Sequence, residues 1–306
     1  MSKRKKIALI ELIILVSTII ICNFIINNNS NQKYKHSSNA STVIIGSKNF
    51  TESKIVMQIW ADALKKEGFN VRTKPNISSS VVYQAIRSKQ VTLYPEYTGT
   101  IALSYLNKNI VGKNEKQIAT IARNGVQKEG LTTLSYAPGN DAQGIAIRTS
   151  IAKRYGIKNI SDLQKKANKI RFASQGEFDK REDGILGLEK VYGKFNFKNH
   201  KVYDPSLKYQ ILEKGEGDIT PASTTEGQLA TGKYFALTDN KHFWPPYNLV
   251  PLIRKSTLDS DPRIAKILNK VNKKLTTKEL QNLNKQVDVD GHSYQYVASK
   301  WVEENY

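Results

Sequence analysis

Short apolar segments alternate with amphipathic segments over the first half of this chain. Residues 43–45, a segment around Val71 and residues 91–93 are apolar and predict three strands. Between them, apolar residues recur at helical spacing, and Gly68 ends the first of two predicted helices. Ser78-Ser79-Ser80 precedes the second helix as its expected cap. Strand and helix therefore alternate as in an open α/β sheet.

Three polar loops follow these strands, at 47–52, 78–80 and 94–100. Ligands bind to open α/β sheets where loops leave the carboxyl ends of the strands, so we expect the three loops to line one edge together. The third loop is the most informative. Pro95 restricts Tyr94 to an extended conformation and predicts a stiff turn, after which Thr98 or Thr100 caps a new helix.

This Tyr-Pro-Glu-Tyr-Thr-Gly-Thr stretch also suggests chemistry. A helix N-terminus favours an anion, and a tyrosine ring such as that of Tyr97 offers its face to a cation. One turn therefore has the means to hold both ends of a zwitterion. The alternative is a plain strand-to-helix turn with two half-buried tyrosines.

The middle of the chain repeats the pattern as a second unit. Strands are predicted at 170–173 and 201–203, and helices from 161, over 185–192 and over 205–214. Apolar segments at 144–147 and 248–253 flank this unit and are interpreted as paired crossover strands. A unit inserted between two crossovers predicts two lobes, a hinge and a ligand cleft between them.

The expected fold is therefore α/β and two-lobed. The first lobe is predicted to comprise residues 43–145 and 246–306, and the second lobe residues 146–245. From Asp261 onward the apolar spacing is helical, and these helices are expected to pack on the first lobe.

The N-terminal segment predicts export and attachment to a membrane. Lys3-Arg4-Lys5-Lys6 precedes an apolar stretch, so residues 1–26 are interpreted as a membrane anchor or signal segment and residues 27–41 as a flexible linker. The basic end is expected in the cytoplasm and the rest of the chain outside. Cys22, the only cysteine, excludes an internal disulfide and is a candidate for lipidation after cleavage, the alternative being a membrane-buried thiol.

Composition narrows the class of function. The chain has 306 residues and a net charge of +20, but its lysines are scattered and match no nucleic-acid motif, so we expect a solvated basic surface beside an anionic membrane. An enzyme is not expected, because no nucleophile elbow or phosphate-binding glycine loop is present. No cofactor is expected either, and the histidines lack metal-site spacing. These are His36, His200, His242 and His292.

Six motifs in order resemble the substrate-binding proteins of osmoprotectant ABC importers, the glycine betaine/carnitine/choline family. The resemblance runs from Val43 to the C-terminus and implies a two-lobed periplasmic-type (type II) binding protein. The motifs are Gly46-Ser47-Lys48-Asn49-Phe50-Thr51-Glu52, Tyr94-Pro95-Glu96-Tyr97-Thr98-Gly99-Thr100, Arg181-Glu182-Asp183-Gly184 with Gly187-Leu188-Glu189, Tyr209-Gln210, Thr224-Thr225-Glu226-Gly227 and Phe243-Trp244-Pro245-Pro246-Tyr247.

The resemblance also implies ligand contacts. In that family tyrosines enclose a quaternary ammonium group, and Tyr97 and Tyr209 are the cage positions that this chain retains. Ala142 and Ser223 stand where aromatic residues are usual. Polar contacts are expected from Asn49, Lys54, Thr100, Asn140 and Thr225.

Each of these residues also has a simpler interpretation. Tyr209 fits the apolar face of its helix, Lys54 a solvated position, and Arg181 with Glu182 a surface or interlobe pair. The Trp244-Pro245-Pro246-Tyr247 segment is expected to lead into the return crossover rather than to touch ligand. Glu52, Glu96 and Glu226 are expected to cap helices or to orient tyrosines.

The ligand itself stays open at this point. Each lost aromatic face costs about 1 kcal/mol of cation binding, so the hypothesis is a small zwitterion that is bulkier or more polar than glycine betaine, with ergothioneine as one candidate. The expected partners are an ABC permease and an ATPase, and the chain is expected to act as a monomer. An anchored ligand sensor is the alternative. Tyr97→Ala is expected to weaken binding without unfolding the domain.

Overall fold

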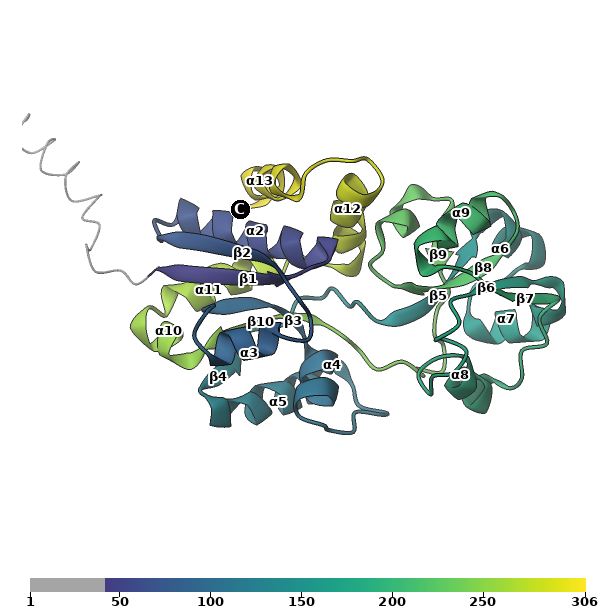
Figure 1. Ribbon diagram of the computed structural model, residues 1–306, viewed down its shortest axis with the longest axis horizontal. Coiled ribbons are helices and arrows are strands. Elements are labelled where there is room, and N and C mark those ends of the chain that lie inside the picture. The colour runs from purple at the N-terminus through teal and green to yellow at the C-terminus, as the bar shows by residue number, and fades with distance from the viewer. Residues whose placement is uncertain (1–41) are drawn as a thin grey trace, which may run out of the picture. The chain divides into compact units, whose positions relative to one another are not determined.

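The computed structural model describes residues 42–306, which form one compact unit (Figure 1). The predicted anchor, linker and lipidation site at Cys22 lie outside the described residues. Among residues 42–306, no helix combines the length and the apolar character needed to cross a membrane.

The first sheet contains the three strands that the sequence pattern predicts. Its strand order is β2-β1-β3-β10-β4, in which β1 is parallel to β2 and β3, and β10 is antiparallel to β3 and β4. Because β1, β2 and β3 are parallel, their carboxyl ends meet at one edge, as predicted for the three polar loops. The strands are β1 Val43–Lys48, β2 Val71–Ile77, β3 Leu93–Tyr97, β4 Leu131–Thr133 and β10 Leu249–Arg254.

The second sheet has the same arrangement, with the order β7-β6-β8-β5-β9. Here β6 is parallel to β7 and β8, while β5 is antiparallel to β8 and β9. Each sheet thus has three parallel strands beside an antiparallel one. The strands are β5 Gln143–Arg148, β6 Arg171–Ser174, β7 Asn199–Val202, β8 Ile219–Ser223 and β9 Tyr234–Ala236.

The prediction of paired crossover strands is wrong. The segment 144–147 lies in β5 of the second sheet, and the segment 248–253 lies mostly in β10 of the first. The connecting segments pair instead at a single bridge between Asn140 and Asn248. Each apolar segment is instead a buried inner strand of its own sheet, β5 between β8 and β9 and β10 between β3 and β4. The predicted boundary between 145 and 146 falls inside β5.

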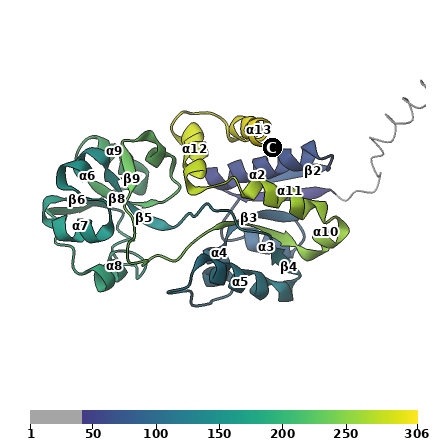
Figure 2. The same ribbon diagram turned by 180° about the vertical axis from the view of Figure 1, so that it is seen from behind.

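Helices cover both sheets (Figures 1 and 2). In the first sheet's core, α11, α12 and α13 pack against α2, as expected for the C-terminal segment. The helices are α2 Thr51–Lys66, α3 Val82–Arg87, α4 Thr98–Thr100, α5 Glu115–Val126, α6 Thr149–Tyr155, α7 Ile160–Lys166, α8 Ile185–Tyr192, α9 Lys208–Glu213, α10 Lys255–Ser260, α11 Arg263–Asn272, α12 Thr277–Asp288 and α13 Tyr294–Asn305.

The stiff turn predicted at Pro95 is instead part of β3. Pro95 lies opposite Pro251 of β10, and the Leu134 N–H donates to the Pro251 carbonyl from the far side of β10. The polar groups of this pair therefore point away from each other, so neither proline removes a bond between the two strands. Tyr94 and Tyr97 are buried in consequence, not half-buried.

The predicted helix caps are also replaced. α4 begins at Thr98, its N-cap is Tyr97, and no side chain bonds to its free N–H groups. The Thr98 hydroxyl instead accepts from the Asn248 N–H at 3.2 Å. At α3 the N-cap is Val81, and it is the Ser78 carbonyl that accepts from the next turn. Both changes arise because backbone groups, at Asn248 just before β10 and at Ser78, supply the partners.

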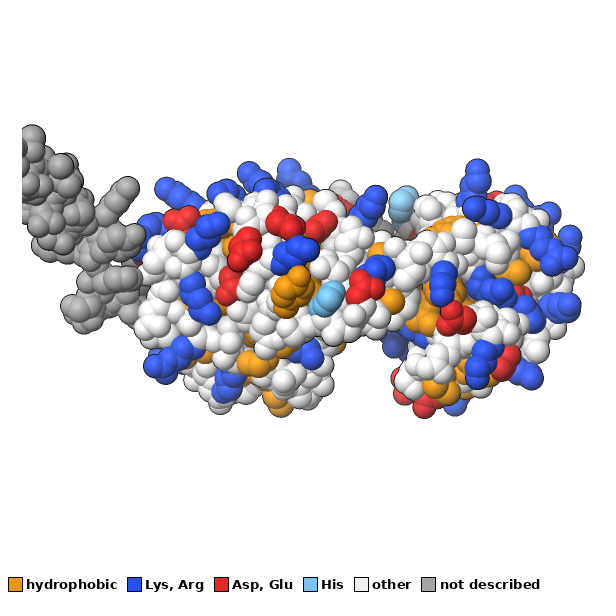
Figure 3. Space-filling view, turned by 90° about the horizontal axis from the view of Figure 1, so that it is seen from above, with side chains coloured by type: hydrophobic (Ala, Val, Ile, Leu, Met, Phe, Trp, Pro, Cys, Tyr) orange, Lys and Arg blue, Asp and Glu red, His pale blue; other side chains and the backbone are white. Residues whose placement is uncertain are grey.

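The basic charge is spread over the surface. On the face in Figure 3, Lys and Arg side chains are distributed over both halves rather than gathered into one patch. This distribution agrees with a solvated basic surface.

Candidate functional site

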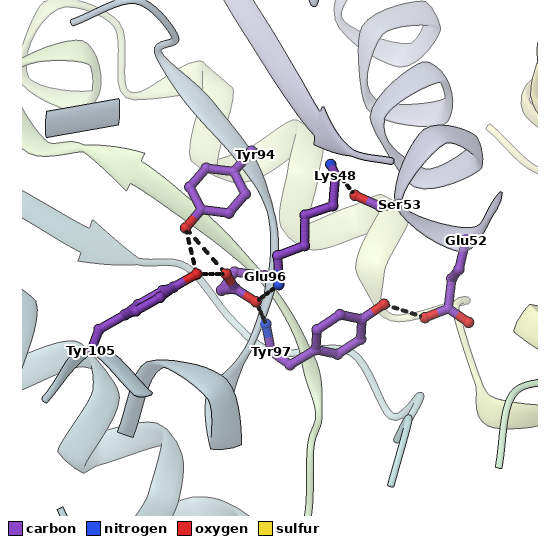
Figure 4. A network of polar contacts seen from close by, with 7 residues as sticks. All are labelled: Lys48, Glu52, Ser53, Tyr94, Glu96, Tyr97 and Tyr105. Carbon is purple, nitrogen blue, oxygen red and sulfur yellow. Dashed lines mark hydrogen bonds and ion pairs between the residues drawn. The ribbon is translucent and has the colours of Figure 1, made fainter. Parts of the chain in front are cut away.

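The edge of the first sheet carries a buried ion pair. Lys48, at the end of β1, pairs with Glu96 of β3, and the two side chains are 6% and 0% exposed (Figure 4). Glu96 also accepts from the Tyr97 N–H at 2.9 Å, the Tyr94 hydroxyl at 3.1 Å and the Tyr105 hydroxyl at 2.5 Å. Both carboxylate oxygens are therefore fully engaged, and the pair is held in one geometry.

Tyr97 is enclosed by its neighbours. Its hydroxyl donates to Glu52 at 2.6 Å, the Lys48 ammonium lies 5.4 Å from its ring centroid, and the Phe50 ring stacks at 6.4 Å. Burial and the nearby Glu52 carboxyl raise the pKa of Tyr97 well above its usual range. Tyr97 also belongs to the first sheet's core, so Tyr97→Ala is expected to cost about 3–5 kcal/mol of stability. The sequence predicted that Tyr97→Ala would leave the domain folded, and the structure replaces this prediction with an expected loss of stability.

Glu52 and Asp141 form an acidic pair beside Tyr97. The Glu52 carboxyl accepts from the Asn284 amide at 2.9 Å, and the Asp141 carboxyl from the Thr225 hydroxyl at 2.8 Å. Burial, followed by repulsion from Asp141, raises the pKa of Glu52 to about 8. Burial also raises the pKa of Asp141. We call Lys48, Glu52, Glu96 and Tyr97 the first cluster.

The second sheet carries a similar group, which we call the second cluster: Lys208, Tyr209 and Glu226. The Glu226 carboxylate accepts from the Lys208 ammonium at 2.6 Å and from the Tyr209 hydroxyl at 2.6 Å. The Lys208 ammonium also lies 5.3 Å from the Tyr209 ring centroid. Burial and Glu226 raise the pKa of Tyr209. The second cluster thus has the same residue types as the first cluster, but one carboxylate, that of Glu226, accepts from both the lysine and the tyrosine.

Two cavities lie at the positions where aromatic residues were expected, and one of them adjoins the second cluster. One of about 230 Å³ lies at the carboxyl ends of β6 and β8, and Ser223, Lys208 and Glu226 line it. The other, of about 780 Å³, lies at the segments that connect the two sheets, and Ala142 and Asn140 line it. Ala142 and Ser223, which stand where aromatic residues are usual, therefore each line a cavity.

The loop after β8 is bound to α12. The Gln281 amide donates to the Thr224 carbonyl at 2.7 Å, and the Asn284 amide to the Thr225 carbonyl at 2.8 Å. Gly227 approaches α12 so closely that a Cβ at this position would lie 2.5 Å from the Lys285 nitrogen. A residue with a side chain has no room here, so the second sheet's loop is held against a helix of the first sheet's core.

The structure places the seven predicted site residues in four locations. Tyr97 and Thr225 meet at the acidic pair, and Tyr209 lies in the second cluster. Asn140 holds the connecting segments: its side chain accepts from the Tyr247 N–H at 2.7 Å, and its N–H donates to Thr277 at 3.0 Å.

The three remaining residues lie near the edge of the first sheet. Thr100 is partly buried in α4, Lys54 is partly buried on α2, and Asn49 is exposed. Their contact with ligand stays a prediction.

Sequence reasoning missed several residues of the acidic pair and its surroundings. Lys48 lies inside the first family motif, residues 46–52, so its position in that motif could have identified it. Asp141 lies between Asn140 and Ala142, which the resemblance singled out, and its position was a similar signal. Asn284 carried no such signal, because its importance depends on contacts between distant segments. The expectation that glutamates orient tyrosines is confirmed for Glu52 with Tyr97 and for Glu226 with Tyr209.

Comparison with known proteins identifies the family. The model of the substrate-binding domain of ABC-type glycine betaine transport systems matches residues 41–304. The chain belongs to this family. Among curated family relatives, the glycine-betaine-binding protein of Pseudomonas aeruginosa is 28% identical over 281 residues, which cover 87% of this chain and 89% of that protein.

A second relative is named for a different ligand. The ergothioneine transport permease/ergothioneine binding protein EgtU of Helicobacter pylori is 27% identical over 263 residues, which cover 85% of this chain but 47% of that protein. A solved glycine betaine/carnitine/choline ABC transporter structure has a TM-score of 0.80 at 24% identity and covers 86% of this chain and 98% of its own. That likeness concerns the fold, which matches two-lobed substrate-binding proteins.

Proposed function

We propose that this chain is the extracellular receptor subunit of an ABC importer and captures a glycine betaine, carnitine or choline type of osmoprotectant. The observation that carries the proposal is the pair of lysine–tyrosine–glutamate clusters, one at the edge of each sheet, in a chain of this family. Tyrosine rings with carboxylates nearby suit an ammonium group. A permease and an ATPase are the partners that import requires.

Capture is coupled to closure in this proposal. Tyr97 and Thr100 belong to the first sheet's unit, and Tyr209 and Thr225 to the second, so a ligand between them stabilises the arrangement in which all four make contact. The attachment of the 224–227 loop to α12 supports a motion that pivots near this contact. The closed form is then the form that docks on the permease.

The proposed location is the outer face of the cell membrane. The basic residues 3–6 followed by an apolar stretch support an uncleaved anchor, and Cys22 supports lipidation as the alternative route. Residues 27–41 would then serve as the tether, and the receptor would stay close to its permease.

A thermal-shift screen tests the function. The full chain in mild detergent is heated with glycine betaine, carnitine, choline, proline betaine or ergothioneine, and unfolding is followed by tryptophan fluorescence. A ligand that binds only the folded state raises the melting temperature, by an amount that grows with its concentration relative to Kd. A shift with any of these ligands is expected. No shift with the whole set, at millimolar concentrations, would contradict the proposal.

A larger zwitterion such as ergothioneine is the second candidate. The cavities at Ala142 and Ser223 favour it, since Ser223 leaves room beside the second cluster and Ala142 leaves room beside Asn140. The ergothioneine-binding relative adds support. A shift with ergothioneine and with none of the simple betaines would identify this form of the function.

A further inference from the structure

The exposed face of α11 carries only basic charge. Residues 263–274, which comprise the helix and the two positions after it, contain five cations and no acidic residue. The neighbouring helices α12 and α13 instead mix lysine with glutamate. The apolar residues of α11 pack into the first sheet's core, so only its basic face is available to a partner. The exposed cations are Arg263, Lys266, Lys270, Lys273 and Lys274.

Most of this charge has no counter-charge within the described chain. Arg263 pairs with Asp261, but among residues 42–306 no carboxylate forms an ion pair with Lys266, Lys270 or Lys273. Lysines that lack a carboxylate partner attract anions from outside the chain. The face of α11 is therefore suited to an anionic partner.

A cavity of about 310 Å³ adjoins this face. Lys266 and Lys270 line it together with the rings of Phe69 and Tyr306. The Lys270 ammonium lies 4.1 Å from the Tyr306 ring centroid, and the Arg263 guanidinium lies 4.8 Å from that of Phe69. The cavity thus combines cations with apolar surface, as a phosphate that carries an organic group requires. A phospholipid headgroup has this chemistry.

The same face lies next to the start of the described chain. Asn70, which follows Phe69, donates its amide to the Thr42 hydroxyl at 3.0 Å, and its carbonyl accepts from the Val43 N–H at 2.9 Å. Figures 1 and 2 both show α11 beside the amino end of β1. Residues 27–41, the proposed tether, therefore join the protein beside this face, and a segment of that length spans at most about 50 Å.

We propose that the basic face of α11 and its adjoining cavity dock on anionic phospholipid headgroups beside the proposed anchor. The inference rests on the proposed location of the receptor and not on the identity of its ligand. Anionic headgroups attract Lys and Arg side chains that lie near the membrane surface. The tether raises the effective concentration of the face at that surface, so weak contacts suffice. Docking restricts the tethered receptor to orientations in which α11 faces the lipid.

Lysine footprinting in nanodiscs tests the docking. The full chain is reconstituted in discs of phosphatidylcholine, with or without about one third phosphatidylglycerol, and an uncharged reagent acylates the accessible lysines, which mass spectrometry quantifies. We expect Lys266 and Lys270 to react about threefold more slowly in the anionic discs. Lys165 and Lys166, exposed at the end of α7, are internal controls whose rates should not change. About 1 M salt should remove the protection, because it shortens the Debye length to about 3 Å.

A pair of substitutions separates docking from mere closeness to the membrane. Lys266→Gln combined with Lys270→Gln removes two cations from an exposed surface, so the fold should be retained, which the melting temperature checks. The protection of Lys273 in anionic discs is expected to fall with them, because fewer cations hold the face on the lipid. Lys165→Gln combined with Lys166→Gln is the matched control and should leave Lys273 protected.

Each outcome bears on the docking. Equal acylation in the two kinds of disc overturns it, and so does protection of Lys273 that survives Lys266→Gln with Lys270→Gln. Equal protection of Lys165 and Lys166 also overturns it, since lipid contact is then not specific to α11. If the chain is not retained in phosphatidylcholine discs, the proposed anchor fails and the docking fails with it. The thermal-shift screen is independent: no shift with any ligand contradicts the receptor function, while protection of α11 in anionic discs still supports the docking.

Discussion

The first and second clusters contain the same residue types but distribute their charges differently. In the second cluster one carboxylate, Glu226, accepts from both the lysine and the tyrosine. In the first cluster the tasks are divided: Glu96 holds Lys48, and Glu52 holds Tyr97. The first cluster therefore has one carboxyl group more than it has cations. Residue composition alone does not reveal this surplus, since it depends on which carboxylate faces which donor.

Burial also separates the clusters. The Lys48 and Glu96 side chains are 6% and 0% exposed, whereas those of Lys208 and Glu226 are 18% and 21% exposed. Each charge of a buried ion pair is stabilised only by its partner, because water does not reach it, whereas water screens the charges of a partly exposed pair. Substitutions in the first cluster should therefore cost more unfolding free energy than the matching substitutions in the second cluster.

The largest difference is expected from removing each lysine. Lys48→Met leaves the Glu96 carboxylate buried without a cation and should cost about 3–5 kcal/mol of unfolding free energy. Lys208→Met should cost about 1 kcal/mol, because water reaches Glu226. Urea denaturation measures both. Equal costs would show that the two pairs share one environment.

A smaller difference is expected from removing each tyrosine hydroxyl. Tyr97→Phe takes a donor from the buried Glu52 and should cost about 1–3 kcal/mol, whereas Tyr209→Phe should cost about 1 kcal/mol, because Glu226 keeps Lys208. Both changes preserve the ring, so cation binding by the ring faces is retained. Denaturation and ligand affinity are measured on the same samples. A larger cost for Tyr209→Phe would reverse the comparison.

A change that concerns the first cluster alone is expected in the pH dependence of stability. The pKa of Glu52 is about 8 in the folded protein and near 4.5 in the unfolded chain, so the folded state binds more protons between these values. Stability from this group is therefore present at low pH and falls as the pH rises from about 5 to about 8. Glu52→Gln should flatten this decline. Melting temperatures across that range measure it, with Asp259→Asn at an exposed carboxylate of α10 as the control; an unchanged slope would remove Glu52 as its source.

Local pattern predicted much of the fold. Helix α8, at Ile185–Tyr192, has the predicted bounds, and β1 and α2 follow the apolar spacing. The errors fell where a distant segment supplied the partner. Pro95 lies in a strand because Pro251 faces it from β10, and Thr98 caps nothing because Asn248 occupies its hydroxyl. The spacing of apolar residues along the chain does not predict such tertiary contacts.

The sequence by itself determined the alternation of elements, the family motifs and the presence of Tyr97 and Tyr209, because spacing and residue type are local properties. Only the tertiary structure decided how the acids are used. Glu52 meets Asn284 across 232 residues of chain, and Asp141 meets Thr225 across 84. Burial and facing charge set the protonation of a carboxyl group, and both arise only when distant segments pack together.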